Sequence, residues 1–414
     1  MSNTSLRYVF PFFIVIIIDA LGFGMMAPLL APMITASYGM LGNTAYAQHL
    51  LYGIVLAAFP LSYMIGAPFL GLLSDYYGRR NVLFVCLIGA LIGFVFYALS
   101  FFYASAALLI LGRIIAGCAS GSQGVAQAAM ADMSHGKEKA VNIGIIAVGL
   151  TIGLVTGPLL AAVLSNSQLV SWFSLTTPFY FVIILSVVNL FLLFYWIPAG
   201  ARMTEGSGDP GFLSYKKIRH LTQNKNTRLL IAVFFLFELG WSLYYQSLAL
   251  FLAKTVHYGT SQIGFFSTYV GVALCMSLII LVRVCVRWLN LKKVVSYALF
   301  IGMLSLFFLF TSPNIFIQSL LAIPITATVA LVYTLLITFL SDSVASNEQG
   351  LLMGITDSVL SLAFAMTGFL SGWLAYFSVY MPFVLASFFW LLAGSTYYFY
   401  SRKKMESECY EAVS

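Results

Sequence analysis

Three acidic residues lie deep inside long apolar stretches of this chain: Asp19, Glu238 and Asp357. An ionisable side chain inside a membrane-length apolar segment is costly, so each is a candidate for function. Asp19 lies about 16 Å from one edge of its stretch at 1.5 Å per residue. Arg113 lies at a similar depth, and the two side chains can pair or compete, which would make the pKa of Asp19 depend on conformation. We therefore expect Asp19, Arg113, Glu238 and Asp357 to take part in proton coupling.

Each of these residues also has another interpretation. Asp19 and Arg113 can form a structural ion pair between helices. Glu238 can be a counter-ion for a cationic ligand or a carboxyl hydrogen-bonded to neighbouring helices. Asp357 lies only about two turns inside its stretch at 3.6 residues per turn, so a gate is an alternative to coupling.

A compact charged cluster, Gly-Leu-Leu-Ser-Asp-Tyr-Tyr-Gly-Arg-Arg at 71–80, separates two apolar stretches in a chain with 8% charged residues. Its acidic residue can interact with the positive end of a helix, and its arginines can bind an acidic partner. We expect a cytoplasmic gate here, although the arginines can instead serve only to set the topology. The predicted gate residues are Gly71, Asp75, Gly78, Arg79, Arg80 and Asp132.

Two further patterns involve packing and a pocket. Gly149, Gly153 and Gly157 repeat on one helix face, which permits close helix approach, and Pro158 can bend the helix. We expect this face to pack against a neighbour and to seal a cavity against proton leak. Aromatic and amide side chains near the buried charges would suit amphiphilic or cationic ligands, although 16% aromatic content places many such rings by chance. The predicted substrate-binding residues are Gln123, Gln127, Trp241, Tyr244, Tyr245 and Gln246.

The elements that must position these residues are membrane-spanning helices. The chain has 414 residues, of which 61% are hydrophobic, and its mean hydropathy is +0.97. Its apolar runs are continuous and do not alternate as barrel strands do, which predicts an all-α integral membrane fold. We expect twelve spans, near residues 8–34, 50–74, 81–102, 106–131, 140–164, 174–198, 228–253, 262–286, 293–312, 314–340, 351–376 and 380–401.

The positive charges set the direction of these spans. With the amino terminus inside, eighteen of the twenty Lys and Arg residues fall in cytoplasmic segments. This asymmetry predicts that both termini are cytoplasmic, and it explains the net charge of +7 without nucleic-acid binding. We expect an amino-terminal six-helix bundle at 1–198, a linker at 199–227, a second bundle at 228–401 and a tail at 402–414.

The two bundles carry traces of an internal repeat. Asp132 and Asp342 are 210 residues apart, and Arg80 and Lys292 are 212 apart. In the second alignment Asp75 falls opposite Arg287, so the acidic residue of the cluster has no counterpart. Two related halves joined by a linker suggest alternating access to a site near mid-membrane.

The segment from Gly71 to Arg80 resembles the loop 2–3 signature of the major facilitator superfamily. Arg113 with Gly117 resembles the span 4 arginine motif of that superfamily, and the ladder from Gly149 resembles the span 5 antiporter motif, with alanines at two usual glycines. The segment from Asp19 to Pro28 is similar to the first span of tetracycline and multidrug exporters. The resemblance covers nearly the whole chain and implies a drug–proton antiporter that functions as a monomer in a bacterial inner membrane, surrounded by membrane lipid.

We therefore expect a proton-coupled exporter of small amphiphilic or drug-like compounds, with no cofactor, no metal and no catalytic residue. A proton-coupled importer of a metabolite or a siderophore-like ligand is the alternative. A membrane enzyme is a remote alternative, because the four histidines lie in or beside loops and do not form a metal-like cluster. A channel is disfavoured, because a repeated bundle with buried titrating groups suits a carrier.

Overall fold

The computed structural model describes residues 3–35, 44–122, 124–126, 129, 137–196, 224–309, 314–344 and 349–413. Within these ranges every regular element is a helix, as expected for an all-α membrane protein. In the amino-terminal part these are α1 (Asn3–Gly24), α2 (Met26–Thr35), α3 (Ala45–Tyr77), α4 (Arg79–Phe102), α5 (Ala106–Ala119), α7 (Lys137–Leu164) and α8 (Thr177–Trp196). The others are α10 (Lys225–Thr255), α11 (Thr260–Met276), the π-helix η3 (Ser277–Leu281), α12 (Val282–Trp288), α13 (Leu291–Phe308), α14 (Ile315–Asp342), α15 (Gln349–Phe377) and α16 (Met381–Val413).

The helices fall at the positions of the predicted spans. Eleven segments of the described chain are long and apolar enough to cross a membrane, and α1 with α2, like α11 with η3 and α12, form one segment each. The remaining expected span, at 140–164, corresponds to α7, of which Val148–Leu164 is a shorter apolar segment among the described residues. The expectation of a helical membrane bundle is therefore confirmed.

The chain packs as two compact units. Unit 1 contains α1 to α8 and also residues His257–Thr268, which include the beginning of α11. Unit 2 contains α10, the rest of α11 and the helices that follow. The first part of α11 groups with unit 1 because Gly264 packs on the end of α7, where an added Cβ would lie 2.4 Å from the carbonyl oxygen of Pro158. The division at 1–198 and 228–401 stays a prediction from the sequence.

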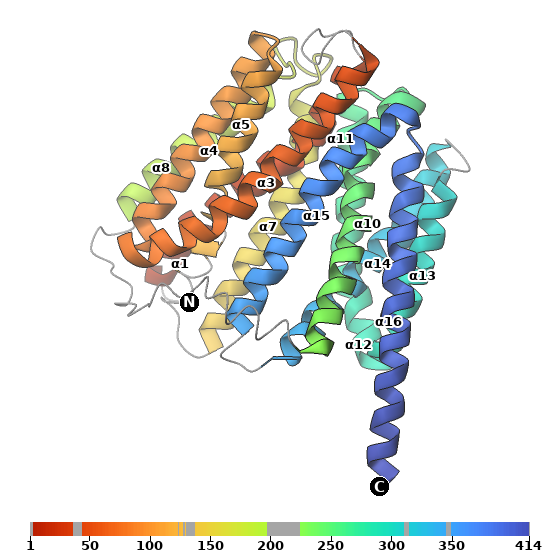
Figure 1. Cartoon of the computed structure of the whole chain (residues 1–414). Coiled ribbons are helices and arrows are strands. Elements are labelled where there is room, and N and C mark those ends of the chain that lie inside the picture. Colours follow the sequence, from red (N-terminus) through yellow and green to blue (C-terminus); the bar gives the residue numbers. More distant parts are fainter. Residues whose placement is uncertain are drawn as a thin grey trace. The chain divides into compact units, whose positions relative to one another are not determined.

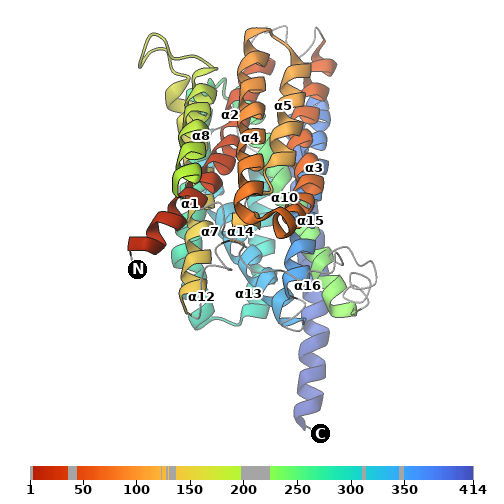
Figure 2. The ribbon, with the colours of Figure 1, turned by 90° about the vertical axis from the view of Figure 1, so that its left-hand side faces the viewer.

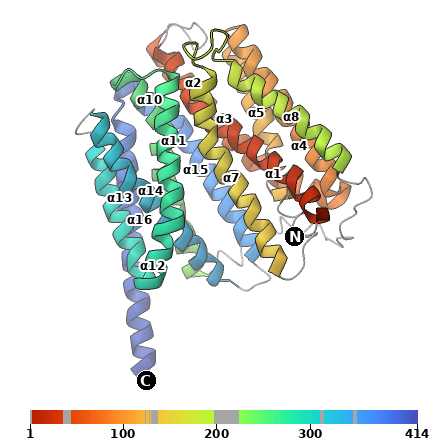
Figure 3. The same cartoon turned by 180° about the vertical axis from the view of Figure 1, so that it is seen from behind.

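Helix pairing within each unit supports the internal repeat. In unit 1, α1 packs on α7 and α4 packs on both α5 and α8. In unit 2, α10 packs on α15 and α13 packs on both α14 and α16. These neighbours can be followed in Figures 1 and 2, and Figure 3 shows α1 beside α7 from behind. The carboxy-terminal turns of α16 extend past the other helices of unit 2 (Figure 1).

Candidate functional site

Asp19 of α1 is held by a serine from another helix. The side chain is partly buried, and the hydroxyl of Ser122 donates a hydrogen bond to its Oδ2. Ser122 is fully buried and lies in the span Ala106–Ala126 that begins with α5. Within the described residues no ion pair or hydrogen bond joins Asp19 to Arg113, so the suggested pairing of these two residues is absent from this structure.

Arg113 binds backbone carbonyls in place of an acid. Its side chain is 1% exposed, and its Nε donates to the carbonyl oxygen of Val55 at 3.0 Å. Its Nη2 donates to the carbonyl oxygen of Leu56 at 3.4 Å, and the guanidinium lies 4.8 Å from the centre of the Phe59 ring. The Tyr97 hydroxyl interacts with the same guanidinium. The cation is thus held by α3 dipoles and an aromatic face.

The local sequence of α3 explains why Arg113 binds there. Pro60 lies inside α3 and has no N–H, so the carbonyl of Leu56 has no helical donor four residues later. The backbones of α3 and α5 also approach closely, because Gly66 and Gly117 lie between them. An added Cβ would lie 2.3 Å from the Cys118 oxygen at Gly66 and 2.5 Å from the Phe59 oxygen at Gly117. Arg113 therefore lies within reach of carbonyls that α3 leaves available.

The glycine face of α7 lies against α1, the helix that carries Asp19. An added Cβ at Gly153 would lie 2.4 Å from the Ala20 Cβ and 2.8 Å from the Ile17 oxygen. An added Cβ at Gly157 would lie 2.9 Å from the Leu21 oxygen. Gly149 is similarly close to the Phe13 ring, and the ring of Pro158 lies against Gly24 at the end of α1. Any side chain on this face would separate α7 from α1.

Glu238 of α10 is the buried carboxyl of unit 2. The side chain is 1% exposed, and neither carboxylate oxygen has a hydrogen-bond partner among the described residues. Its backbone oxygen accepts a hydrogen bond from the Ser242 hydroxyl at 2.6 Å. An ionised carboxylate without a partner is costly in such surroundings, so this group is suited to binding a proton.

Trp390 of α16 holds the α10 backbone next to Glu238. Its indole Nε1 donates to the Phe237 oxygen at 3.0 Å, and its ring stacks on the Phe237 ring at 6.0 Å with an interplanar angle of 16°. Gly240 and Gly302 make room for the indole, since an added Cβ would lie 2.3 Å from it at Gly240 and 2.4 Å at Gly302. Residues 237–240 are therefore fixed in position by α16.

The aromatic and amide candidates on α10 separate into two groups. Trp241 and Tyr245 are partly exposed, and their rings lie 5.7 Å apart. Tyr244 is 1% exposed and packs edge-on against Phe383 at 6.0 Å. Gln246 is buried, and its Nε2 donates to the Phe364 oxygen at 3.1 Å and to the Thr367 hydroxyl at 2.9 Å.

This difference decides which α10 candidates can meet a ligand. Tyr244 and Gln246 are engaged in helix packing within unit 2, because their side chains fill the contacts of α10 with α15 and α16. Trp241 and Tyr245 follow Glu238 at three and seven residues, which places all three near one face of the helix. Trp241 and Tyr245 are the more exposed of the four α10 candidates, and the part of all four in substrate binding stays a prediction.

Asp357 and three other candidates need separate description. Asp357 lies in α15 with its side chain exposed, and its backbone oxygen accepts a hydrogen bond from Ser361 at 2.7 Å. Gln123, Gln127 and Asp132 lie outside the described residues. Their expected parts in substrate binding and gating stay predictions.

The cluster at 71–80 comprises the end of α3, Gly78 and the first two residues of α4. Gly78 ends one helix and precedes the other with φ +88° and ψ 144°, a conformation that L side chains rarely adopt. Arg79 donates to the Ser74 hydroxyl, and Arg80 donates from Nη2 to the Phe194 oxygen at 2.9 Å. Arg80 also lies over the Phe84 and Phe194 rings, at 5.4 and 5.7 Å.

Asp132, the expected acidic partner of these arginines, lies outside the described residues, so that contact stays a prediction. Arg80 binds the end of α8, because a helix carboxy terminus has carbonyls without helical donors and carries partial negative charge. The Asp75 side chain lies outside the described part of the chain, so its expected contact with a helix end stays a prediction. Around Gly71 an added Cβ would meet nothing within 4 Å.

Sequence reasoning missed Ser122, Pro60 and Trp390. A serine next to Gln123 in an apolar span, and a proline inside another span, were visible signals that a polar contact forms there. Trp390 gave no signal beyond its size. In the described part of the chain no three His, Cys, Asp or Glu residues form a group that could hold a metal ion.

Known proteins resemble this chain in sequence and in structure. The family model described as Major Facilitator Superfamily matches residues 12–366. The tetracycline resistance protein, class B, of Escherichia coli is 24% identical over 253 residues, which are 61% of this chain and 60% of that protein. The alignment with this relative therefore spans less than two thirds of its length.

A second relative aligns over nearly the whole chain. The tetracycline resistance protein, class H, of Pasteurella multocida is 24% identical over 397 residues, which are 94% of this chain and 95% of that protein. The crystal structure of the human organic anion transporter MFSD10 (TETRAN) is similar with a TM-score of 0.67 and 18% sequence identity, covering 96% of this chain and 100% of that one. From the family match and the helical fold together, the chain belongs to the major facilitator superfamily of membrane transporters.

Proposed function

We propose that this protein exports small amphiphilic or drug-like compounds in exchange for protons, by alternating access. In this proposal it works as a monomer in a bacterial inner membrane, with both termini in the cytoplasm. The observation that carries the proposal is a pair of carboxyl groups inside spans, Asp19 in unit 1 and Glu238 in unit 2. Neither forms an ion pair within the described residues, so no fixed positive charge neutralises either group.

The two carboxyl groups have different parts in this proposal. Asp19 accepts a hydrogen bond from Ser122, which comes from a different helix, so a relative movement of the two helices would change the stability of its ionised form. A proton carrier requires this link between conformation and protonation. Glu238 lies next to Trp241 and Tyr245, where it can bind a proton or balance the charge of a cationic ligand.

The relatives support the proposed direction of transport. The class B and class H proteins are named for tetracycline resistance, which is consistent with removal of a drug from the cell. The α7 face against α1 supports the same direction, because its glycine ladder resembles the antiporter motif. Close packing of α7 on the helix that carries Asp19 would also limit proton leak past that residue.

The experiment uses the purified protein in proteoliposomes that contain a pH-sensitive dye. Tetracycline and ethidium are added as probes, and substrate-evoked proton movement is recorded for the wild type, Asp19→Asn and Glu238→Gln. Glu408→Gln, in the carboxy-terminal tail, is the matched control because it removes an acidic residue outside the spans. We expect proton movement in the wild type and the control, and its loss in Asp19→Asn.

Two results would contradict the proposal. Full proton coupling in Asp19→Asn would remove that residue from the coupling site. Proton movement in the same direction as the probe, and evoked only by a metabolite or an iron chelate, would identify an importer.

A further inference from the structure

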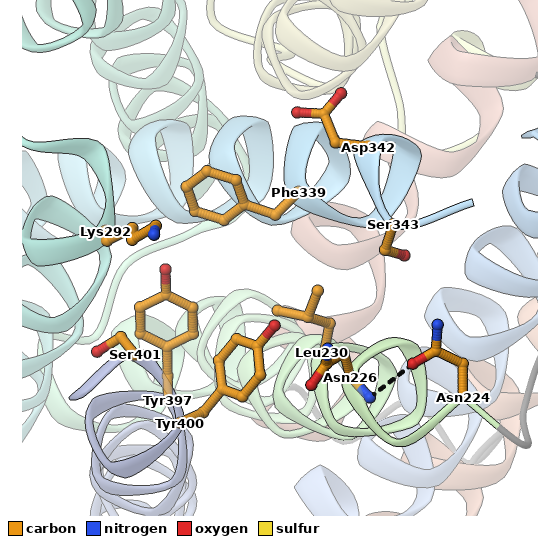
Figure 4. Close-up of a pocket in the computed structure, with 10 residues that line it drawn as sticks. All are labelled: Asn224, Asn226, Leu230, Lys292, Phe339, Asp342, Ser343, Tyr397, Tyr400 and Ser401. Atoms are coloured by element: carbon orange, nitrogen blue, oxygen red, sulfur yellow. Dashed lines mark hydrogen bonds between the residues drawn. The ribbon is translucent and has the colours of Figure 1, made fainter. Parts of the chain in front are cut away.

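A cavity of about 330 Å³ with charged, amide, hydroxyl and aromatic side chains in its lining lies in unit 2 (Figure 4), and Glu238 is not part of that lining. This volume falls within the range of small-molecule sites. Four helices contribute to it: α10 and α13 at their beginnings, α14 at its end and α16 near the end of its apolar span at Arg402. Its lining consists of Asn224, Asn226, Leu230, Lys292, Phe339, Asp342, Ser343, Tyr397, Tyr400 and Ser401.

The cavity lies at a membrane boundary. The apolar spans of these four helices begin or end at Lys225, Leu291, Asp342 and Arg402, which are all at or within a few residues of the lining. The spans Lys225–Thr255 and Ile315–Asp342 have 31 and 28 residues, more than the about 20 that cross the hydrocarbon core, so we place their charged ends and the cavity at the depth of phospholipid head groups. The distribution of Lys and Arg predicts that this end of unit 2 faces the cytoplasm.

The cavity has a positive and a negative side. Lys292 is the second residue of α13, so its ammonium group and the positive end of that helix occupy the same side. Asp342 is the last residue of α14, where the helix end is negative. In Figure 4 these two side chains lie apart with Phe339 between them, and the rings of Tyr397 and Tyr400 lie below.

The aromatic rings form a wall between the two charges. Tyr397 stacks with Phe339 at 6.5 Å and an interplanar angle of 10°, and it lies 6.2 Å from the Tyr400 ring. The two tyrosines offer hydroxyl groups to an anion, and ring faces attract an ammonium group. A ligand with a phosphate at Lys292 and an amine near Asp342 would match this arrangement.

An apolar groove of about 360 Å³ lies along two of these helices, α13 and α16, and extends deeper into the span. It lies between α13 and α16, and its lining is Ser296, Tyr297, Phe300, Trp390, Leu391, Gly394, Ser395, Tyr398 and Phe399. Tyr297 is 65% exposed and Phe300 is 55% exposed, so the groove opens on the outer surface of the span. From Lys292 to Ser296 the rise along α13 is about 6 Å, at 1.5 Å per residue. Along α13 the groove thus begins one turn from Lys292, and along α16 its residues Tyr398 and Phe399 lie at the level of Tyr397 and Tyr400 of the cavity.

Unit 1 fills the corresponding place with its own side chain. Arg80, the second residue of α4, aligns with Lys292 in the internal repeat and binds the Phe194 oxygen near the end of α8. Its guanidinium lies over the Phe84 and Phe194 rings. Unit 2 has the shorter Lys292 at this position, and a cavity is found beside it.

We propose that unit 2 binds one phospholipid with a phosphate–amine head group. The phosphate binds Lys292, the amine faces Asp342, and one acyl chain occupies the groove between α13 and α16. The charge arrangement selects the head group, and the neighbouring apolar groove selects a lipid over a free phosphate ester. This site is independent of the proposed proton coupling, because binding is measured without transport.

The test titrates the delipidated, full-length protein with defined lipids and counts bound lipid by native mass spectrometry. The probes are palmitoyl-oleoyl phosphatidylethanolamine, phosphatidylglycerol and phosphatidylcholine, together with soluble glycerophosphoethanolamine. The variants are Lys292→Gln, Asp342→Asn and Gly394→Leu. Lys293→Gln is the matched control, because Lys293 is the next residue of the same helix and does not line the cavity.

We expect the wild type and Lys293→Gln to bind one phosphatidylethanolamine in preference to the other lipids. Lys292→Gln should weaken binding of this lipid and of phosphatidylglycerol by about tenfold, the effect of losing one charged hydrogen bond. Asp342→Asn should remove the preference for phosphatidylethanolamine. Gly394→Leu should weaken the binding of all three lipids alike, because the leucine side chain fills the groove and leaves the charged residues in place.

Two outcomes would overturn the proposal. Equal lipid binding in Lys292→Gln and Lys293→Gln would show that the cavity does not hold the phosphate. Binding of glycerophosphoethanolamine as tight as that of the lipid would show that the groove contributes nothing and that the cavity takes a soluble ligand.

Discussion

Pro60 of α3 and Arg113 of α5 are complementary. Pro60 provides no N–H for the carbonyl of Leu56, and the Arg113 guanidinium donates to that oxygen and to the Val55 oxygen. A buried cation is therefore accommodated in unit 1 by carbonyl groups, with no carboxylate as its partner among the described residues. Arg113 is therefore not a counter-ion of Asp19. The proton-coupling proposal requires this, because a fixed positive charge next to Asp19 would keep it ionised.

The first prediction tests this complementarity with a double-mutant cycle. Arg113→Gln should destabilise the protein by about 3 kcal/mol, because it leaves buried carbonyls without donors and a space where the guanidinium was. In a Pro60→Ala background a helical N–H becomes available to Leu56, so the cost of Arg113→Gln should fall by about 1 kcal/mol. Unfolding free energies from denaturant titration in mixed micelles would measure both.

Pro68 provides the control for this cycle, because it lies in the same helix and its missing N–H concerns a different carbonyl. Pro68→Ala should leave the cost of Arg113→Gln unchanged. If Pro60→Ala and Pro68→Ala lower the cost of Arg113→Gln by the same amount, the stabilisation by Arg113 does not depend on the Leu56 carbonyl.

The second prediction concerns Glu238. Since neither carboxylate oxygen has a partner in the described part of the chain, Glu238→Gln breaks no hydrogen bond of that side chain. It removes a buried ionisable group, so the unfolding free energy should stay the same or rise by about 1 kcal/mol. Transport should lose part of its pH dependence, because the glutamine cannot bind or release a proton.

Two measurements are needed for Glu238→Gln, unfolding in mixed micelles and probe uptake at several pH values. A large loss of stability would show that the carboxyl is bound by groups that the described residues do not include. An unchanged pH profile with intact transport would leave Glu238 as a structural residue.

The helices and their order in the chain could be predicted from the sequence. Continuous apolar runs and the asymmetry of Lys and Arg are local signals that need no knowledge of packing. The glycines from Gly149 to Gly157 also predicted a close helix contact, because their spacing places them on one face. The identity of the neighbour, α1, could not be predicted, since it depends on the arrangement of the bundle.

The contacts of the site were harder to predict than its residues. Asp19 and Ser122 are 103 residues apart, and no pattern in either span indicates that their helices meet. Arg113 was expected near an acid because charge pairing is the usual way to bury an arginine. A proline in a neighbouring span was the only sign that a carbonyl would be available, and its partner could not be named before the fold was known.

The third prediction compares Gly78, between α3 and α4, with Gly71, inside α3. Gly78→Ala should destabilise the protein by about 1 kcal/mol or more, because φ is +88° there. Gly71→Ala should be neutral or stabilising by about 0.5–1 kcal/mol, because Gly71 lies inside α3 and an added Cβ meets nothing within 4 Å. Unfolding of both variants under the same conditions would show the difference.

Transport assays add information for Gly71. If Gly71→Ala keeps its stability but loses transport, the glycine is needed in a conformation other than this one. Equal losses of stability in the two variants would contradict the assignment of backbone strain to Gly78 alone.

The fourth prediction concerns the support of Glu238 by Trp390. Gly240→Ala should destabilise unit 2 by about 1–3 kcal/mol, because its Cβ would lie 2.3 Å from the indole and 3.0 Å from the Ala386 oxygen. Trp390→Phe should cost about 1–2 kcal/mol through the lost hydrogen bond to the Phe237 oxygen and a small cavity. A smaller ring also makes room for the added methyl group, so the double variant should lose less than the sum of the two single variants.

The contact of Gly264 with Pro158 provides a control for the contact of Gly240 with Trp390. Gly264→Ala should also destabilise the protein, because its Cβ would lie 2.4 Å from the Pro158 oxygen, but its cost should add to that of Trp390→Phe. Unfolding free energies of the single and double variants would measure both couplings. If Gly240→Ala and Trp390→Phe are additive as well, the indole does not hold residues 237–240, and the position of Glu238 must depend on other contacts of α10.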